Sequence, residues 1–221
     1  MSQNPECNED DFLSPDWIRE EVTRLVEIHV SGTIPPIVQL GHPVLRMPAQ
    51  EFTGQLDATL LREFLDTMKT VMHDAPGVGL AAPQLGIPLR IAVLEDMYPT
   101  NDDVAAVRER MPLEYFEVLN PTYVARGKRT AAFYEGCLSF NGYQAVVDRP
   151  ADIDTAYMDA DGLAHNRSFS GWQARIFQHE TDHLDGTVYI DKALTRSLCA
   201  SHEFIRWANP GIEEARIGLN F

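Results

Sequence analysis

The sequence predicts an α+β fold in which antiparallel β-sheets wrap around a central helix at residues 171–185. Apolar residues recur at helical spacing near the start of the chain, after residue 57 and again after residue 170. Short apolar runs bounded by glycine and proline fill the middle of the chain, as in strands. With 221 residues, 44% of them hydrophobic, the chain is long enough to bury one sizeable core.

The first two helices are predicted from apolar stripes with signals at their ends. In residues 14–32, Ser14 can act as the N-cap, Pro15 fits the first turn and Gly32 ends the helix. Residues 57–74 carry the strongest amphipathic pattern in the sequence. Residues 34–49 between them are interrupted by prolines and glycine, and we expect extended chain there.

The middle of the chain reads as strands separated by loops. We expect a loop of small residues at 77–86, and an exposed loop at 96–112 because that segment is polar and flanked by prolines. A hairpin should turn at Asp161-Gly162, and Ser170 should cap the helix that follows. The predicted strands are 89–95, 115–124, 144–149 and the two arms of 151–170.

Composition argues against several classes of protein. The formal net charge of −15 opposes non-specific binding to nucleic acid or to anionic membranes, and no apolar run is long enough for a membrane span. The first dozen residues lack the basic start and apolar run of a secretion signal. Three scattered cysteines are too few for a disulfide framework, which favours a reducing compartment. We therefore expect the protein in a bacterial cytoplasm or an equivalent organelle compartment.

Residues 178–186, QHETDHLDG, contain the pattern His-Glu-x-x-His, which indicates a metal site when it lies on a helix. His179 and His183 are four residues apart, so they share a helix face and could hold one metal ion together. Glu180 would stand beside that ion, where a general base belongs. The same pattern is also compatible with the polar stripe of a surface helix.

The residue pattern alone does not decide which side chain is the third metal ligand. Tyr189 occupies the position where a metzincin protease has its last histidine, which excludes that pattern. Glu203 has a spacing compatible with a thermolysin-like protease. Cys137, in the segment EGCLS, could complete a site of two histidines and one thiolate, although a lone cysteine is more often an inert buried residue.

Three separated motifs then occur together in one order. They are GVGLAAPQ at residues 77–84, EGCLS at 135–139 and HETDH at 179–183. The three motifs and their order resemble those of the peptide deformylase family. The likeness extends from about residue 36 to about residue 194. Thr181 departs from the apolar residue usual there, and Phe140-Asn141-Gly142 follows the second motif where many members carry a proline.

The resemblance implies an activity and a cofactor. A family member removes the formyl group from the N-terminal formyl-methionine of new polypeptides. It uses one divalent ion, natively Fe²⁺, with Zn²⁺, Ni²⁺ or Co²⁺ as alternatives that fit the same ligands. The resemblance makes Cys137, His179 and His183 the ligands.

The resemblance also assigns the catalytic groups. Glu180 would act as general base and then as general acid. The side-chain amide of Gln84 and the backbone N–H of Leu138 would donate hydrogen bonds to the oxyanion. Arg149 would pair with Glu135 to brace the ligand loop.

Substrate should pair as an added strand along Val78-Gly79, and an apolar pocket lined by Val78, Leu138 and Ile176 should accept methionine. Ile176 could equally be ordinary core. The expected partners are formyl-methionyl nascent peptides and, transiently, the ribosome. Two rival hypotheses are an endopeptidase that uses Glu203 and a metal-retaining, inactive binding protein on the ribosome.

The predicted organisation has three parts. Residues 1–34 form an extension that contains a helix, residues 35–195 the catalytic domain, and residues 196–221 a tail. The sequence suggests no function for the extension or the tail.

Overall fold

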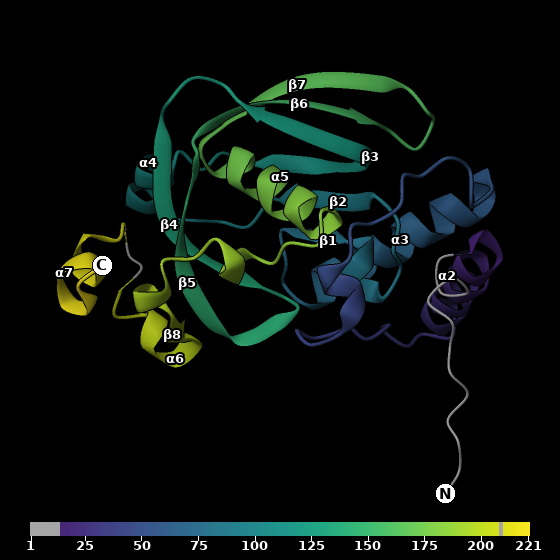
Figure 1. The fold of residues 1–221 in the computed structure, drawn as a ribbon, viewed down its shortest axis with the longest axis horizontal. Coiled ribbons are helices and arrows are strands. Elements are labelled where there is room, and N and C mark those ends of the chain that lie inside the picture. The colour runs from purple at the N-terminus through teal and green to yellow at the C-terminus, as the bar shows by residue number, and fades with distance from the viewer. Residues whose placement is uncertain (1–13, 208–209) are drawn as a thin grey trace, which may run out of the picture.

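Two antiparallel sheets form the framework of the protein in the computed structural model, which describes residues 14–207 and 210–221 (Figure 1). The larger sheet has the order β1-β2-β3-β6-β7, and its strands are β1 (Gly79–Ala81), β2 (Ile91–Asp96), β3 (Leu113–Ala125), β6 (Asp152–Met158) and β7 (Ala164–Ser170). The smaller sheet has the order β4-β5-β8, and its strands are β4 (Thr130–Cys137), β5 (Phe140–Pro150) and β8 (Cys199–Ala200).

Helix α5 (Gly171–Leu184) lies between the two sheets, so the predicted α+β fold with a central helix is confirmed (Figure 1). Its apolar residues, including Ala174, Phe177 and Leu184, pack with the larger sheet in one core cluster. Ser170 occupies the N-cap position as predicted, but its hydroxyl makes no capping bond and instead accepts a hydrogen bond from Arg126. The remaining, polar face of α5 is therefore available for a site.

Helices α2 (Pro15–Val30) and α3 (Ala58–Asp74) pack against each other beside the larger sheet. Both were predicted, and their ends are capped as expected for a serine and an aspartate. The Ser14 hydroxyl accepts the Trp17 N–H at 3.2 Å, and Asp57 accepts the Leu60 N–H at 3.0 Å. Their buried faces belong to a single core cluster, together with β2.

Two predicted loops contain regular structure, so both predictions were wrong in part. Residues 77–86 include β1, the edge strand of the larger sheet, followed by the 3₁₀ turn η2 (Ala82–Leu85). Residues 96–112 include α4 (Asp102–Arg108), whose first turn is capped by the side chain of Asn101. Helix α4 buries none of its residues, which explains why it has no apolar stripe. The extended segment 34–49 also contains a 3₁₀ turn, η1 (Pro43–Arg46).

The C-terminal segment is attached to the smaller sheet. After the 3₁₀ turns η3 (Tyr189–Asp191) and η4 (Thr195–Ser197), strand β8 pairs with β5, and helices α6 (Ser201–Phe204) and α7 (Glu213–Leu219) follow. Buried residues of β4, β5 and α7 share one apolar cluster. The boundaries at residues 34 and 195 remain a prediction.

Within residues 14–207 and 210–221, no helix combines the length and the apolar character needed to cross a bilayer.

Candidate active site

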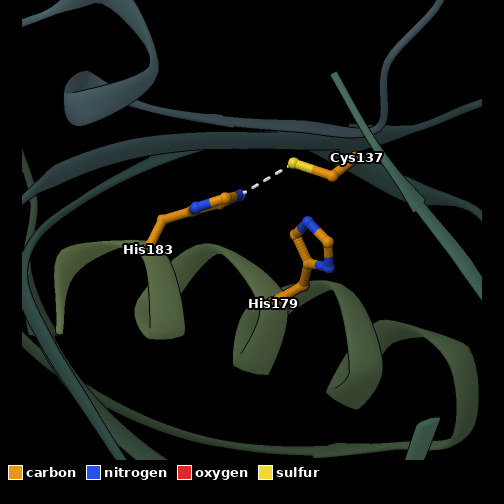
Figure 2. Close-up of side chains that lie close together, drawn as sticks. All are labelled: Cys137, His179 and His183. Carbon is orange, nitrogen blue, oxygen red and sulfur yellow. Dashed lines mark hydrogen bonds between the residues drawn. The ribbon is translucent and has the colours of Figure 1, made fainter. Parts of the chain in front are cut away.

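Three side chains from two elements converge on one point (Figure 2). His179 and His183 project from the same face of α5, with ring centroids 5.0 Å apart, and Cys137 lies at the end of β4. The Sγ atom of Cys137 is 3.2 Å from Nε2 of His183, and one ligand atom from each of the three residues lies within 4.8 Å of the others. The structure therefore brings together the three ligands that the resemblance implied.

The available atoms of these residues suit a metal ion. Nδ1 of His179 is hydrogen-bonded to Glu135 at 2.9 Å, which leaves its Nε2 for a ligand. Nδ1 of His183 is buried and has no hydrogen-bond partner among the residues that the structure describes, and its Nε2 faces Cys137. Burial lowers the pKa of His183 well below its usual value, which favours the neutral imidazole that binds metals. A thiolate with two imidazoles fits Zn²⁺ or Fe²⁺.

Glu203 does not join this group. It lies in α6 and forms an ion pair with Arg206 at 2.6 Å. Among the described residues, the cluster that could hold a metal consists of the cysteine and the two histidines alone. The thermolysin-like hypothesis thus loses its third ligand.

Glu135 braces the candidate ligand His179 from a buried position. Arg149 donates to it from Nε at 2.6 Å and from Nη2 at 2.9 Å, as predicted. Arg175 donates a further hydrogen bond at 2.5 Å. Burial alone would raise the pKa of Glu135, but the charge of Arg149 and the hydrogen bond to His179 hold it well below the usual range. Glu135 is therefore an anion that orients the imidazole.

Asp182 extends this network to the other side of Arg149. It accepts a hydrogen bond from Nη1 of Arg149 at 2.7 Å, and others from Tyr123 at 2.9 Å and Lys192 at 2.7 Å. Arg149 therefore connects β4 to α5. The sequence reasoning assigned no role to Asp182 or to Arg175. The sequence did contain one indication for Arg175. It lies one helical turn before His179, so both side chains are on the same face of the helix.

Glu180 lies beside the ligand cluster and is buried. Burial raises its pKa to about 7. Its Oε2 atom has no hydrogen-bond partner within the described part of the chain. A Cβ atom added to Gly79 would lie 2.3 Å from Oε1 of Glu180, so the absence of a side chain at Gly79 makes room for this carboxylate. The sequence predicted that substrate pairs along Gly79, but it did not predict this contact with Glu180.

Gln84 presents its amide nitrogen to the cluster. Its Oε1 accepts the Ala81 N–H at 2.9 Å, which directs Nε2 toward Sγ of Cys137, 3.7 Å away, and toward the Ser139 hydroxyl at 3.3 Å. Gln84 is 2% exposed, so its side chain is buried and held beside the cluster. Leu138 follows Cys137 directly, and its carbonyl accepts a hydrogen bond from Gln39 at 3.0 Å.

A cleft of about 420 Å³ opens over these groups. All four predicted substrate residues line it, namely Val78, Gly79, Leu138 and Ile176. Ile176 is also only 3% exposed and packs in the core with Phe177, so it serves both as cleft wall and as core.

The two departures from the family motifs have different surroundings. Thr181 is buried, and its hydroxyl donates to the Phe177 carbonyl at 2.8 Å, so the extra polar group is satisfied within α5. Phe140, Asn141 and Gly142 line the cleft. This stretch therefore changes the cleft wall, whereas Thr181 changes only the packing behind it.

Comparison with known proteins gives one family. Residues 34–197 match the sequence profile described as Polypeptide deformylase. The chain is 47% identical over 219 residues to Peptide deformylase 3 of Streptomyces avermitilis, covering 97% of this chain and 98% of that protein. It is 44% identical over 171 residues to Peptide deformylase 1A, chloroplastic, of Solanum lycopersicum, covering 75% of this chain and 61% of that protein.

A solved structure agrees with this result. A class I type b peptide deformylase from Acinetobacter baumannii, bound to Met-Ala-Ser, matches with a TM-score of 0.65 and 26% identity, covering 72% of this chain and 98% of that chain. The chain therefore belongs to the peptide deformylase family and is a metal-dependent hydrolase that removes the N-formyl group from newly made polypeptides.

Proposed function

We propose that Cys137, His179 and His183 hold the divalent ion of this deformylase and that Glu180 moves the protons of the reaction. The observation that carries the proposal is the convergence of three ligand atoms within 4.8 Å of one another. They lie in one cleft with Glu180, whose buried Oε2 has no hydrogen-bond partner among the described residues. When bound, the ion supplies a Lewis acid that polarises the formyl oxygen and lowers the pKa of water.

Glu180 takes the proton from the attacking water and later passes it to the leaving amide nitrogen. A group that both accepts and donates a proton works best when its pKa is near the operating pH. Burial brings the pKa of Glu180 to about 7, which suits both roles. Gly79 has no side chain, and this leaves the space that the carboxylate of Glu180 fills.

Gln84 and Leu138 stabilise the negative charge that develops on the formyl oxygen. Donors act best when they are fixed before the reaction. The hydrogen bond from the Ala81 N–H to Oε1 of Gln84 fixes the amide, so its Nε2 faces the ligand cluster. The backbone N–H of Leu138, next to Cys137, is the second donor.

Substrate lies along β1 as an added strand. Strand β1 is an edge strand that pairs only with β2 in the described sheet, so a peptide can approach its other edge. Backbone pairing accepts many sequences, as a general deformylase requires. The methionine side chain enters the apolar part of the cleft beside Val78, Leu138 and Ile176.

Gly79→Ala tests the position of Glu180. The added methyl group would fall 2.3 Å from the carboxylate, so the carboxylate must move by an ångström or more. We expect kcat to fall about 10²-fold, because a displacement of about 1 Å in a catalytic group can cost that much. Metal content should be unchanged. Both are measured on purified, metal-loaded protein.

Gly136→Ala is the matched control, since its Cβ would meet its nearest neighbour at an ordinary 3.5 Å. It lies in the same cleft and should keep near-normal kcat. A Gly79→Ala enzyme with normal kcat would contradict the assigned position of Glu180.

We also propose Fe²⁺ as the native ion, as the family resemblance implies. Fe²⁺ held by an oxidisable thiolate in an open cleft should make the enzyme lose activity in air within hours, whereas Ni²⁺ or Co²⁺ forms should stay active. Activity and metal content are followed together after purification without oxygen. A verified iron form that keeps its activity in air would argue for zinc.

The proposed setting is a bacterial cytoplasm or an equivalent organelle compartment. A bacterial relative and a relative named as chloroplastic support this proposal. Because the substrate is a newly made chain, transient association with the ribosome is part of it.

A further inference from the structure

An extended segment outside the three motifs, residues 38–40, contacts both parts of the chain that carry the proposed oxyanion donors. The Val38 N–H donates to the Gln84 carbonyl at 2.9 Å. Two residues later, the Leu40 N–H donates to the Ser139 carbonyl at 2.7 Å. The segment therefore joins the 3₁₀ turn η2 to the turn between β4 and β5.

The side chain of Gln39, in the middle of this segment, makes hydrogen bonds to both ends of the β4–β5 turn. Its Nε2 donates to the Leu138 carbonyl at 3.0 Å, and its Oε1 accepts the Asn141 N–H at 3.3 Å. Nε2 also donates to the Ile37 carbonyl at 3.3 Å, within its own part of the chain. One exposed amide therefore serves a donor and an acceptor of the turn at the same time.

The β4–β5 turn has a backbone conformation that hairpins do not favour. Cys137 pairs with Phe140, so Leu138 and Ser139 are the two residues of the turn. Two-residue turns that fit the twist of their strands need at least one residue with a positive φ. Neither Leu138 nor Ser139 is among the residues of positive φ in the described chain. The turn therefore depends on hydrogen bonds from outside the hairpin.

The peptide group between Leu138 and Ser139 is held at both of its polar ends. Its carbonyl, on Leu138, accepts the hydrogen bond from Gln39. Its N–H, on Ser139, donates to Sγ of Cys137 at 3.4 Å. Because the carbonyl and the N–H belong to one planar unit, a rotation of this peptide group would break both bonds together. The hydrogen bond from Gln39 therefore keeps the N–H directed at the sulfur.

We propose that Gln39 is a positioning residue for the deformylase reaction, because it locks the peptide group 138–139 and thereby holds the Ser139 N–H on the thiolate of Cys137. The inference rests on the proposed role of Cys137 as a metal ligand. Hydrogen bonds to a ligand sulfur change how strongly that sulfur donates to its metal. Gln39 is not part of the metal cluster and does not line the cleft, so it acts through the turn.

The test uses cobalt-substituted enzyme, whose sulfur-to-Co²⁺ charge-transfer band reports on the thiolate. Gln39→Met keeps the length of the side chain and removes its hydrogen bonds to the turn. The band should move to longer wavelength, because a thiolate that has lost a hydrogen bond gives up electron density more easily. On formyl-Met-Ala, kcat should fall about 3- to 10-fold with KM within about 2-fold, a smaller loss than the 10- to 100-fold typical of a direct partner of a metal ligand.

Gln39→Glu separates the two contacts that the amide makes with the turn. A carboxylate still accepts the Asn141 N–H but cannot donate to the Leu138 carbonyl. The band and kcat should therefore change as they do in Gln39→Met. A Gln39→Glu enzyme with the wild-type band and rate would count against the proposal, because the lock would then not depend on the donor.

Gln55→Met is the matched control. The amide of Gln55 also bridges a loop, since Nε2 donates to the Glu51 carbonyl at 2.8 Å and Oε1 accepts the Thr53 N–H at 2.8 Å. Gln55 does not line the cleft, so its replacement should leave the band, kcat and metal content unchanged. A general effect of losing a loop amide would appear in both variants, whereas the proposed role appears only at Gln39.

Either an unchanged band or an unchanged kcat in Gln39→Met would overturn the proposal. The first would mean that water serves the turn as well as Gln39 does, and the second that the position of the turn does not affect the reaction. A wild-type cobalt enzyme without any sulfur-to-metal band would instead overturn the proposed ligation by Cys137.

Discussion

Glu180→Gln should lower kcat by about 10²–10⁴, equivalent to roughly 3 to 5.5 kcal/mol of barrier, while the protein keeps its metal. Glutamine preserves the size of the side chain but cannot accept the proton. The cluster that could hold a metal, among the described residues, does not include Glu180, so ion binding should not depend on it. Because the same group also serves the leaving nitrogen, the loss can exceed this range.

The measurement pairs steady-state kinetics on formyl-Met-Ala with metal analysis of the same sample. Glu203→Gln is a suitable control, since Glu203 pairs with Arg206 outside the metal cluster. A variant that loses metal together with activity would make Glu180 a ligand or a structural brace. A near-normal rate would mean that another group moves the proton.

Cys137→Ala should lose most of its bound metal and, with it, the activity. Removing an outer partner of a metal ligand typically lowers metal affinity by 10- to 100-fold, and removing a ligand itself should cost more. The methyl group of alanine leaves only two imidazoles at the site, too few for a stable catalytic centre. Metal affinity is measured by competition with a chelator, and activity on formyl-Met-Ala is measured in parallel.

Cys199→Ala and Glu203→Ala are the controls for this variant. Both residues lie in the C-terminal segment, and neither belongs to the metal cluster of the described residues. They should retain the ion. Cys7 lies outside the described residues and offers a further sequence-based control. An enzyme that loses metal on Glu203→Ala but keeps it on Cys137→Ala would revive the protease hypothesis.

The elements predicted best are those whose sequence pattern reflects burial. Helix α3 was clear because its buried residues repeat along one face, and the β6–β7 hairpin was clear because Asp161-Gly162 marks its turn. Helix α4 was missed because it buries none of its residues, so its cap at Asn101 was the remaining signal. Strand β1 was missed because all of its few residues are buried, which leaves no alternation to read.

The site was predictable where its residues are close in sequence. The spacing of His179 and His183 indicated two candidate ligands. Cys137 could be chosen over Glu203 as the third only through the resemblance to a family. The three donors around Glu135 come from β5 and from α5, so their meeting depends on the tertiary fold. Phe204 of α6 also lines the cleft, and the short pairing of β8 with β5 that precedes α6 is indicated by no local pattern.

The bridge that Arg149 makes between Glu135 and Asp182 has a consequence for metal uptake. It joins the strand that ends at Cys137 to the helix that carries both histidines, and it does so through protein atoms alone. The conformational entropy of arranging the donors is therefore lost when the chain folds, before any ion arrives. We expect reconstitution to be limited by diffusion and dehydration of the ion, so that one divalent ion can replace another without refolding.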